Sequence, residues 1–168
     1  IFLIVTGSCL FLRAQNAWIN EIHYDNTGTD AGEFIEVVIQ NAGSYTLSDF
    51  MVTLYNGGNG TSYGTKTLDL FTAGATSNGF SIYYFVYPSN GIQNGSPDGM
   101  ALSYQSVLIP GQFLSYEGVF TGSGGVADGI LSVDIGVMEG GSDPLGMSLQ
   151  LSGSGTQYNQ FSWQGPAD

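Results

Sequence analysis

Glycine is spread along the whole chain, and this distribution limits the folds that the chain can adopt. The 168 residues include 26 glycines, about 15% of the chain and roughly twice the average usage. They lie between short runs of aromatic and β-branched residues and are not gathered into one linker. This pattern predicts many short strands joined by tight turns. After the first fifteen residues, no segment has a convincing helical period over three turns.

The β-prone runs recur between turn signals. We expect strands on both sides of the polar loop 25–32, and further strands at residues 50–55, 63–70, 80–87, 99–104, 112–116, 147–151 and 161–163. Both faces of residues 80–87 are apolar or aromatic, which predicts a strand buried in the middle of a sheet. Residues 118–129 are rich in glycine and are expected to form a long mobile loop. Roughly eight to ten short strands with uneven loops predict an antiparallel β-sandwich, with a closed barrel as the alternative.

Length and composition predict one domain. Residues 1–15 are largely apolar but too short to span a bilayer as a helix, and they resemble the remnant of a secretory signal. A buried first strand is the alternative. We expect the β-sandwich at residues 16–163 and the start of a linker at 164–168. Without residues 1–15 the chain has no cysteine, hence no disulfide, which favours a secreted or cell-surface bacterial protein.

The chain is strongly acidic. Lys and Arg total 2 against 14 Asp and Glu, so the formal net charge is -12. Nucleic-acid affinity depends on cations that neutralise phosphates, so this charge argues against direct binding of DNA or RNA. Acidity can serve solubility alone, and cation binding is the alternative.

The polar loop 25–32 follows the first β-prone run. The stretch 18–40 around it holds five of the acidic residues and His23, the only histidine. Asp25, Asp30 and Glu33 bracket the loop, and oxygen-rich loops of this kind suit calcium. Their spacing does not match an EF-hand. The sequence therefore leaves two alternatives for these residues, a Ca²⁺ site and a solvated loop.

Catalytic residues are scarce. His23 is the only candidate for a base that titrates near neutral pH, and a strand histidine is more often at the surface or hydrogen-bonded. No nucleophile elbow, phosphate-binding glycine loop or Cys/His cluster occurs. Glu33 and Glu36 are three residues apart and are expected on opposite faces of a strand, so a glycosidase pair would need an acid from elsewhere. We therefore predict a domain without catalytic residues. Its many aromatic side chains could stack on sugars, or pack the core.

Several segments together resemble the lamin-tail domain family, in the bacterial form that precedes the catalytic part of large secreted nucleases. They cover nearly all of the chain after the signal-like segment, in the family's order and spacing, at residues 18–26, 32–37, 54–57, 63, 92–102, 113–118, 148–151 and 161–163. The first of them reads WINEIHYDN and the longest reads IQNGSPDGMAL.

The resemblance implies an immunoglobulin-like β-sandwich and a non-catalytic accessory role beside a catalytic domain further along the same chain. The leading hypothesis is a secreted module that binds or positions, at the N-terminus of an extracellular nuclease of the endonuclease/exonuclease/phosphatase class. A free-standing adhesion or carbohydrate-binding module is the alternative. That this domain is itself a hydrolase is the third hypothesis.

Overall fold

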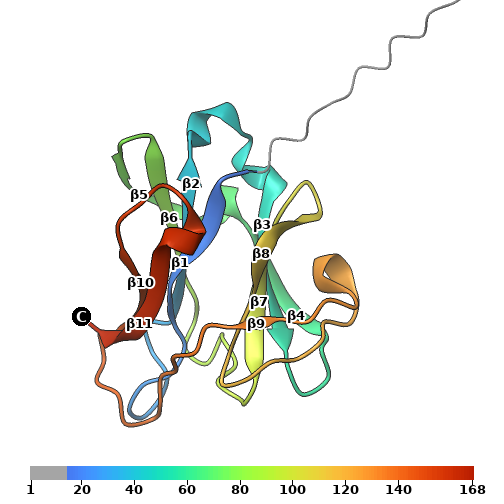
Figure 1. The fold of residues 1–168 in the computed structure, drawn as a ribbon. Coiled ribbons are helices and arrows are strands. Elements are labelled where there is room, and N and C mark those ends of the chain that lie inside the picture. The colour runs from blue at the N-terminus through green and yellow to red at the C-terminus, as the bar shows by residue number, and fades with distance from the viewer. Residues whose placement is uncertain (1–14) are drawn as a thin grey trace, which may run out of the picture.

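The computed structural model describes residues 15–168, so the predicted signal segment lies almost entirely outside the described residues. In this part of the chain eleven strands form two sheets that pack face to face, and the all-β, immunoglobulin-like sandwich is confirmed (Figure 1). The strands are β1 Ala17–His23, β2 Phe34–Gln40, β3 Phe50–Asn56, β4 Ser62–Thr67, β5 Thr72–Ser77, β6 Phe80–Val86, β7 Asp98–Tyr104, β8 Val107–Tyr116, β9 Val133–Asp134, β10 Ser148–Gly153 and β11 Phe161–Ala167.

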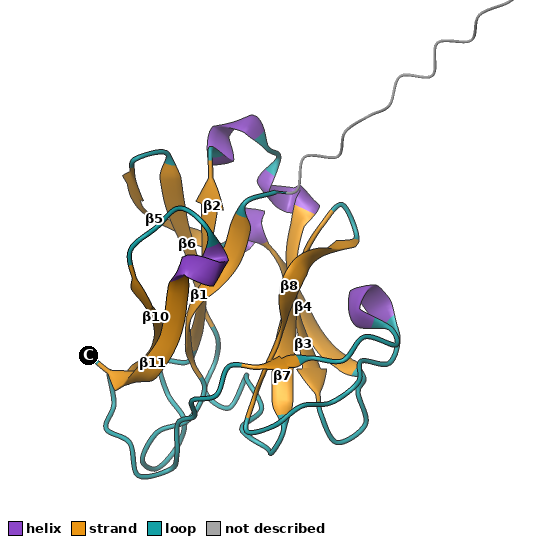
Figure 2. Ribbon diagram, viewed as in Figure 1, coloured by secondary structure: helices purple, strands orange, loops and turns teal. Residues whose placement is uncertain are grey.

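Within residues 15–168, helical structure is limited to short 3₁₀ turns in the connections between strands (Figure 2). These are η1 Ala42–Ser44, η2 Leu47–Asp49, η3 Leu68–Leu70, η4 Gly125–Ala127 and η5 Tyr158–Gln160. No helix within residues 15–168 is long and apolar enough to cross a membrane.

The larger sheet has the order β11-β10-β1-β2-β6-β5, with all neighbours antiparallel. Because β1 lies near its centre, the first strand of the domain is hydrogen-bonded to β2 on one side and to β10 on the other. The smaller sheet has the order β4-β3-β7-β8-β9. Its one parallel pair joins β8 to the two-residue strand β9.

The main core lies between the sheets and is built by alternating residues of the inner strands. Ile19, Ile35, Val37 and Ile39 from β1 and β2 face Phe50, Val52, Leu54 and Leu102 from β3 and β7, and all are buried. A second apolar cluster lies on the outer side of the smaller sheet, where the loop after β8 covers Tyr55, Ala101 and Phe113 with Phe120 and Ala127. This loop includes the stretch predicted to be mobile, yet its backbone is hydrogen-bonded, from Gly122 to Ile130 and from Ser123 to Gly60.

The structure differs from the sequence-based expectations in three places. Residues 80–87, predicted to be buried on both faces, form β6 next to the sheet edge, and most of its side chains are half-buried. The edge strand β5 was not predicted, because its sequence TAGATS has little β propensity and all six residues are exposed. Residues 164–167, predicted to open a linker, belong to β11. The eleven strands within residues 15–168 are close to the roughly eight to ten expected.

Candidate functional site

A β-bulge at Asn20 decides which side chains of β1 face solvent. The pairing with β2 shifts register between Ile19 and Glu21, and both Ile19 and Ile22 point into the core. Strict alternation would send Ile19 and Ile22 to opposite faces. The bulge therefore turns Glu21 to the outer face of the larger sheet, together with Trp18. Inside the sandwich, the buried Gln112 of β8 supports the bulge, because its Oε1 accepts a hydrogen bond of 2.8 Å from the backbone N–H of Ile19.

A row of polar side chains crosses the outer face at the level of Glu21. Directly paired residues on antiparallel strands point to the same face, and the registers pair Glu21 with Glu36 and with Gln150, Glu36 with Tyr84, Gln150 with Gln164, and Tyr84 with Thr72. We call this set the polar row. In strand order from β11 to β5 it comprises Gln164, Gln150, Glu21, Glu36, Tyr84 and Thr72. Every strand of the larger sheet contributes one residue to it.

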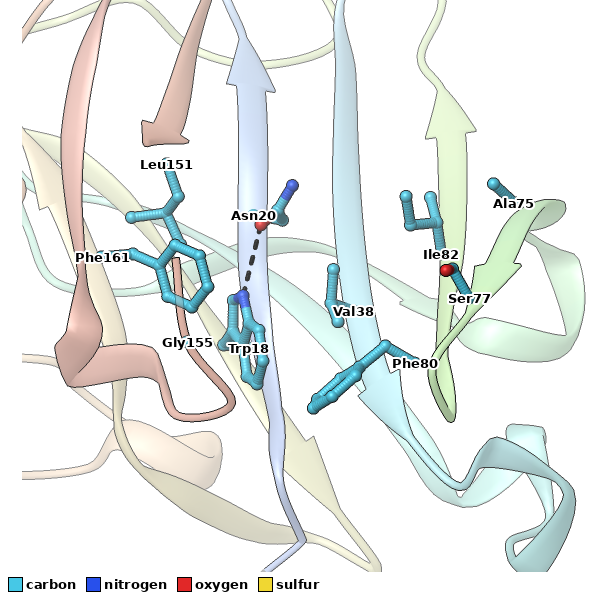
Figure 3. Close-up of a pocket in the computed structure, with 10 residues that line it drawn as sticks. All are labelled: Trp18, Asn20, Val38, Ala75, Ser77, Phe80, Ile82, Leu151, Gly155 and Phe161. Carbon is cyan, nitrogen blue, oxygen red and sulfur yellow. Dashed lines mark hydrogen bonds between the residues drawn. The ribbon is translucent and has the colours of Figure 1, made fainter. Parts of the chain in front are cut away.

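An apolar cleft lies on the outer face beside Glu36 and Tyr84 of the polar row, with a volume of about 340 Å³. Its lining residues Leu151 and Phe161 alternate along β10 and β11 with Gln150 and Gln164, so these two amides point away from the cleft. Figure 3 shows Trp18 at its floor, with Phe161 on one side and Phe80 on the other. The Trp18 ring centroid is 5.7 Å from that of Phe80 and 5.9 Å from that of Phe161. The remaining lining residues are Asn20, Val38, Ala75, Ser77, Ile82, Leu151 and Gly155. Since Trp18 is only 3% exposed, the half-buried rings of Phe80 and Phe161 are the ones that a ligand can reach.

The bulge residue Asn20 joins the cleft to the polar row. Its Oδ1 accepts a hydrogen bond of 3.3 Å from the Trp18 indole Nε1 (Figure 3), and its Nδ2 donates one of 2.7 Å to Glu36 Oε1. Burial raises the pKa of the Glu36 carboxyl, and the neighbouring Glu21 charge raises it further. Glu21 itself accepts a hydrogen bond of 2.5 Å from Ser148 Oγ. No salt bridge involving Glu21 or Glu36 occurs within residues 15–168.

His23 also points to the outer face, but the segment around Glu139 covers it, and it is 2% exposed. Its Nδ1 is 2.8 Å from Glu139 Oε1, and its Nε2 is 3.0 Å from Asn26 Nδ2. The hydrogen bond with Glu139 raises the pKa of the imidazole, against the opposing effect of burial. With both ring nitrogens engaged by buried partners, His23 is placed as a structural residue at the end of β1.

Three buried carboxylates hold the loops at this end of the sandwich, and each accepts two backbone N–H groups. Glu139 accepts from Tyr24 and Asp25, Glu33 from Gly91 and Ile92, and Asp98 from Gly57 and Gly95, at 2.6–3.1 Å. Burial raises the pKa of both Glu33 and Asp98. Because a buried amide without a partner is costly, these carboxylates fix the conformation of the loops that they reach.

Of the three residues predicted to bind calcium, the structure brings Asp25 and Asp30 together and engages Glu33 with another loop. Burial raises the pKa of the Asp25 carboxyl, and the adjacent Asp30 raises it further. Asp30 accepts hydrogen bonds from Asn26 N–H and Asn94 Nδ2. Glu33 is committed to the loop around Gly91, and no group of three or more His, Cys, Asp or Glu side chains within residues 15–168 is arranged to hold a metal ion. Calcium binding by Asp25, Asp30 and Glu33 stays a prediction.

A smaller polar hollow of about 260 Å³ lies among the loops at the same end. It is lined mainly by Asp30, Asn56, Asn90, Gln93, Asn94 and Asp98. Both Asp98 oxygens already accept backbone N–H groups, and both Asp30 oxygens accept hydrogen bonds. The hollow is therefore largely a product of the hydrogen bonds that hold the loops.

The sequence analysis predicted the candidate site in the loop 25–32 and missed the residues on the outer face of the larger sheet. Glu21, Gln150 and Gln164 carry no motif, and only strand pairing brings them together. Glu139 was missed because it is 116 residues from His23. The spacing of three between the apolar residues Ile19 and Ile22 was the one local sign of the bulge. Comparisons with protein-family models, with curated proteins and with solved structures find no match.

Proposed function

We propose that the chain is a non-catalytic accessory module of the lamin-tail type, which binds a ligand or positions a catalytic domain in a secreted bacterial protein. The larger protein in this proposal is an extracellular nuclease whose catalytic domain follows further along the same chain. The module makes no direct contact with nucleic acid, since Lys66 is the one Lys or Arg among residues 15–168 and its Nζ lies over the Phe85 ring, 5.0 Å from the centroid.

The observation that supports the non-catalytic role is that the buried titratable side chains are hydrogen-bonded to other buried groups and to the backbone. A general base must reach the proton that it removes, yet both nitrogens of His23 are engaged by buried partners. The carboxylates of Glu139, Glu33 and Asp98 are in turn bonded to backbone amides. These groups stabilise loops and leave little capacity for chemistry.

The segments that carry the lamin-tail resemblance support the family part of the proposal. They include most of β1 and β2, the end of β3, and parts of β7, β8, β10 and β11. They also include Glu33 and Asp98, two of the carboxylates that hold the loops. The resemblance therefore rests on residues with architectural roles in both sheets.

The second candidate is a free-standing adhesion or carbohydrate-binding module. The observation that favours it is the open apolar cleft on the outer face of the larger sheet. Reading the gene beyond the codon for Asp168 separates the candidates. A continuation that encodes an α/β nuclease domain supports the accessory role, and a stop codon there contradicts it.

Two assays test the absence of chemistry and the calcium prediction. The purified 168-residue chain is expected to leave DNA and phosphate esters intact, and turnover that disappears in His23→Ala would overturn the proposal. Calorimetric titration with calcium after chelator treatment tests the site at Asp25, Asp30 and Glu33. Binding heat that Asp30→Asn removes supports this site, and no heat at millimolar calcium contradicts it.

A further inference from the structure

We propose that Asn78 is a site of spontaneous covalent modification, at which the folded chain deamidates while its other Asn-Gly sequences are protected. The reacting group is the side-chain amide of Asn78, and water is the co-reactant. This inference goes beyond the proposed function, since it requires neither a ligand nor a catalytic domain, and its test does not depend on either.

The backbone N–H that follows an asparagine controls this reaction. Asparagine amides are among the thermolabile groups of proteins. The peptide nitrogen of the next residue attacks the side-chain carbon Cγ, the bond from Cγ to Nδ2 breaks, and the proton of the N–H leaves with the ammonia. Water then opens the cyclic imide at either carbonyl group, which gives aspartate or isoaspartate. A glycine in the next position allows the closest approach, because it has no side chain.

A hydrogen bond from this N–H to an acceptor holds both the proton and the backbone in place. Asparagine precedes glycine at Asn56-Gly57, Asn59-Gly60, Asn78-Gly79, Asn90-Gly91 and Asn94-Gly95. Asp98 accepts the N–H of Gly57 at 2.8 Å and that of Gly95 at 2.9 Å. Glu33 accepts the N–H of Gly91, and the backbone oxygen of Asn56 accepts that of Gly60, both at 2.7 Å. The carboxylates that hold the loops therefore also protect the asparagines in them.

The N–H of Gly79 differs from the others, because no hydrogen bond from it is found within residues 15–168. Asn78 and Gly79 have φ values of 51° and 82°, and Ser77 is paired with Phe80. The two residues therefore form a type I′ turn between β5 and β6. Both of them are exposed, so solvent reaches the amide and the N–H together.

The turn has to open before the Gly79 nitrogen can reach Asn78 Cγ, and its place in the sheet favours opening. β5 is an edge strand that pairs with β6 alone, and all six of its residues are exposed (Figure 1). A bulge between Ala73 and Thr76 interrupts this pairing. Segments with few buried contacts open locally at a low cost in free energy. The bond from Asn41 N–H to Gly79 O, at 2.6 Å, is the tertiary contact that opening breaks.

Modification of Asn78 would change one wall of the apolar cleft. Ser77 and Phe80, on either side of the turn, both line the cleft (Figure 3). Either product adds a negative charge, and isoaspartate also inserts a carbon atom into the backbone between these two residues. Because the length of a turn fixes the register of its hairpin, isoaspartate is expected to disturb the pairing of Ser77 with Phe80.

The test follows the 168-residue chain by peptic peptide mapping and mass spectrometry during incubation in mildly alkaline buffer. In the folded chain Asn78 is expected to react about ten times faster, or more, than each of the other four asparagines that precede glycine. In urea sufficient to unfold the chain, where the protecting hydrogen bonds are lost, the five rates should approach one another. This comparison separates the effect of the fold from that of the local sequence.

Asn78→Gly supplies the matched variant, because Gly-Gly also suits a type I′ turn. It should remove the dominant deamidation of the folded chain and leave the other four rates within about twofold of the parent. Equal or faster reaction at any of the other four asparagines in the folded chain would overturn the assignment. An Asn78 that stays intact in the folded chain and reacts in urea would also overturn it, since the hairpin would then not open.

Discussion

Glu21 on β1 and Glu36 on β2 are directly opposed on the outer face of the larger sheet. Like charges opposite one another on paired strands are destabilising, and no salt bridge among the described residues relieves this pair. Burial raises the pKa of the Glu36 carboxyl, and the charge of Glu21 adds to this increase. The domain therefore retains an unfavourable contact on the two central strands of the larger sheet, and functional sites often retain such contacts.

Removing one of these charges should stabilise the protein. Glu21→Gln keeps an oxygen that can accept from Ser148 and removes the repulsion, so the free energy of unfolding in urea at pH 7 should rise by about 0.5 kcal/mol. The gain should shrink at lower pH, as Glu36 becomes protonated. Asp168→Asn, which removes an exposed charge elsewhere, should have almost no effect. A lower stability of Glu21→Gln would contradict the opposition of the two charges.

The bond between His23 and Glu139 should make stability depend on pH near neutrality. The folded-state pKa of His23 is raised above its ordinary value of 6.5, so its contribution is complete below about pH 6.5 and is lost as pH rises through the folded-state pKa. Urea unfolding from pH 5.5 to 8.5 should show this decline. In His23→Asn, which leaves no histidine, the part of the decline that lies above pH 6.5 should disappear. An unchanged profile in the variant would refute this assignment.

Glu139 should contribute several kcal/mol to the free energy of unfolding. Glu139→Ala leaves the N–H groups of Tyr24 and Asp25 without their acceptor and removes the partner of His23. The expected loss is about 2–4 kcal/mol in the free energy of unfolding. Glu139→Gln retains one acceptor oxygen and should lose about half as much. Amide exchange measured by NMR should accelerate at Tyr24 and Asp25 in the alanine variant, and protection equal to that of the parent would count against this role.

Gln112 should hold the bulge in place from inside the sandwich. Gln112→Met keeps the side-chain volume and removes the acceptor for Ile19 N–H, which should cost about 1–3 kcal/mol. Gln164→Met makes the same chemical change at an exposed position and should stay within about 0.5 kcal/mol of the parent. Equal stabilities of the two variants in urea would exclude the proposed support of the bulge.

The fold was largely predictable from the sequence because most strands are runs of β-prone residues bounded by turn residues. The alternation in β2, with Ile35, Val37 and Ile39 inward, reads directly from the chain. The exposed edge strand β5 was not predictable, since its Ala, Gly and Ser residues pack against little and its structure comes from pairing with β6.

The candidate site was less predictable, because its members meet only through register. One extra residue at Asn20 reverses the face of Glu21, and alternation alone would have assigned Glu21 to the core side. Glu33 and Glu36 were expected apart, and they are, with Glu33 turned to the loop at Gly91 and Glu36 at the surface. The acid that lies beside Glu36 is Glu21, which the sequence could not single out.

The central position of β1 has a consequence for how the chain is made. On a ribosome β1 can pair with β2 early, but its other edge stays unpaired until β10 at residues 148–153 has been synthesised. The contact of His23 with Glu139 likewise forms only after Glu139 has been synthesised. Contacts of such long sequence separation form slowly, and an unpaired strand edge invites aggregation meanwhile. One edge of β1 therefore stays unpaired and open to intermolecular contacts during most of the translation of this domain. Chaperones that bind unfolded segments are expected to matter most in that interval.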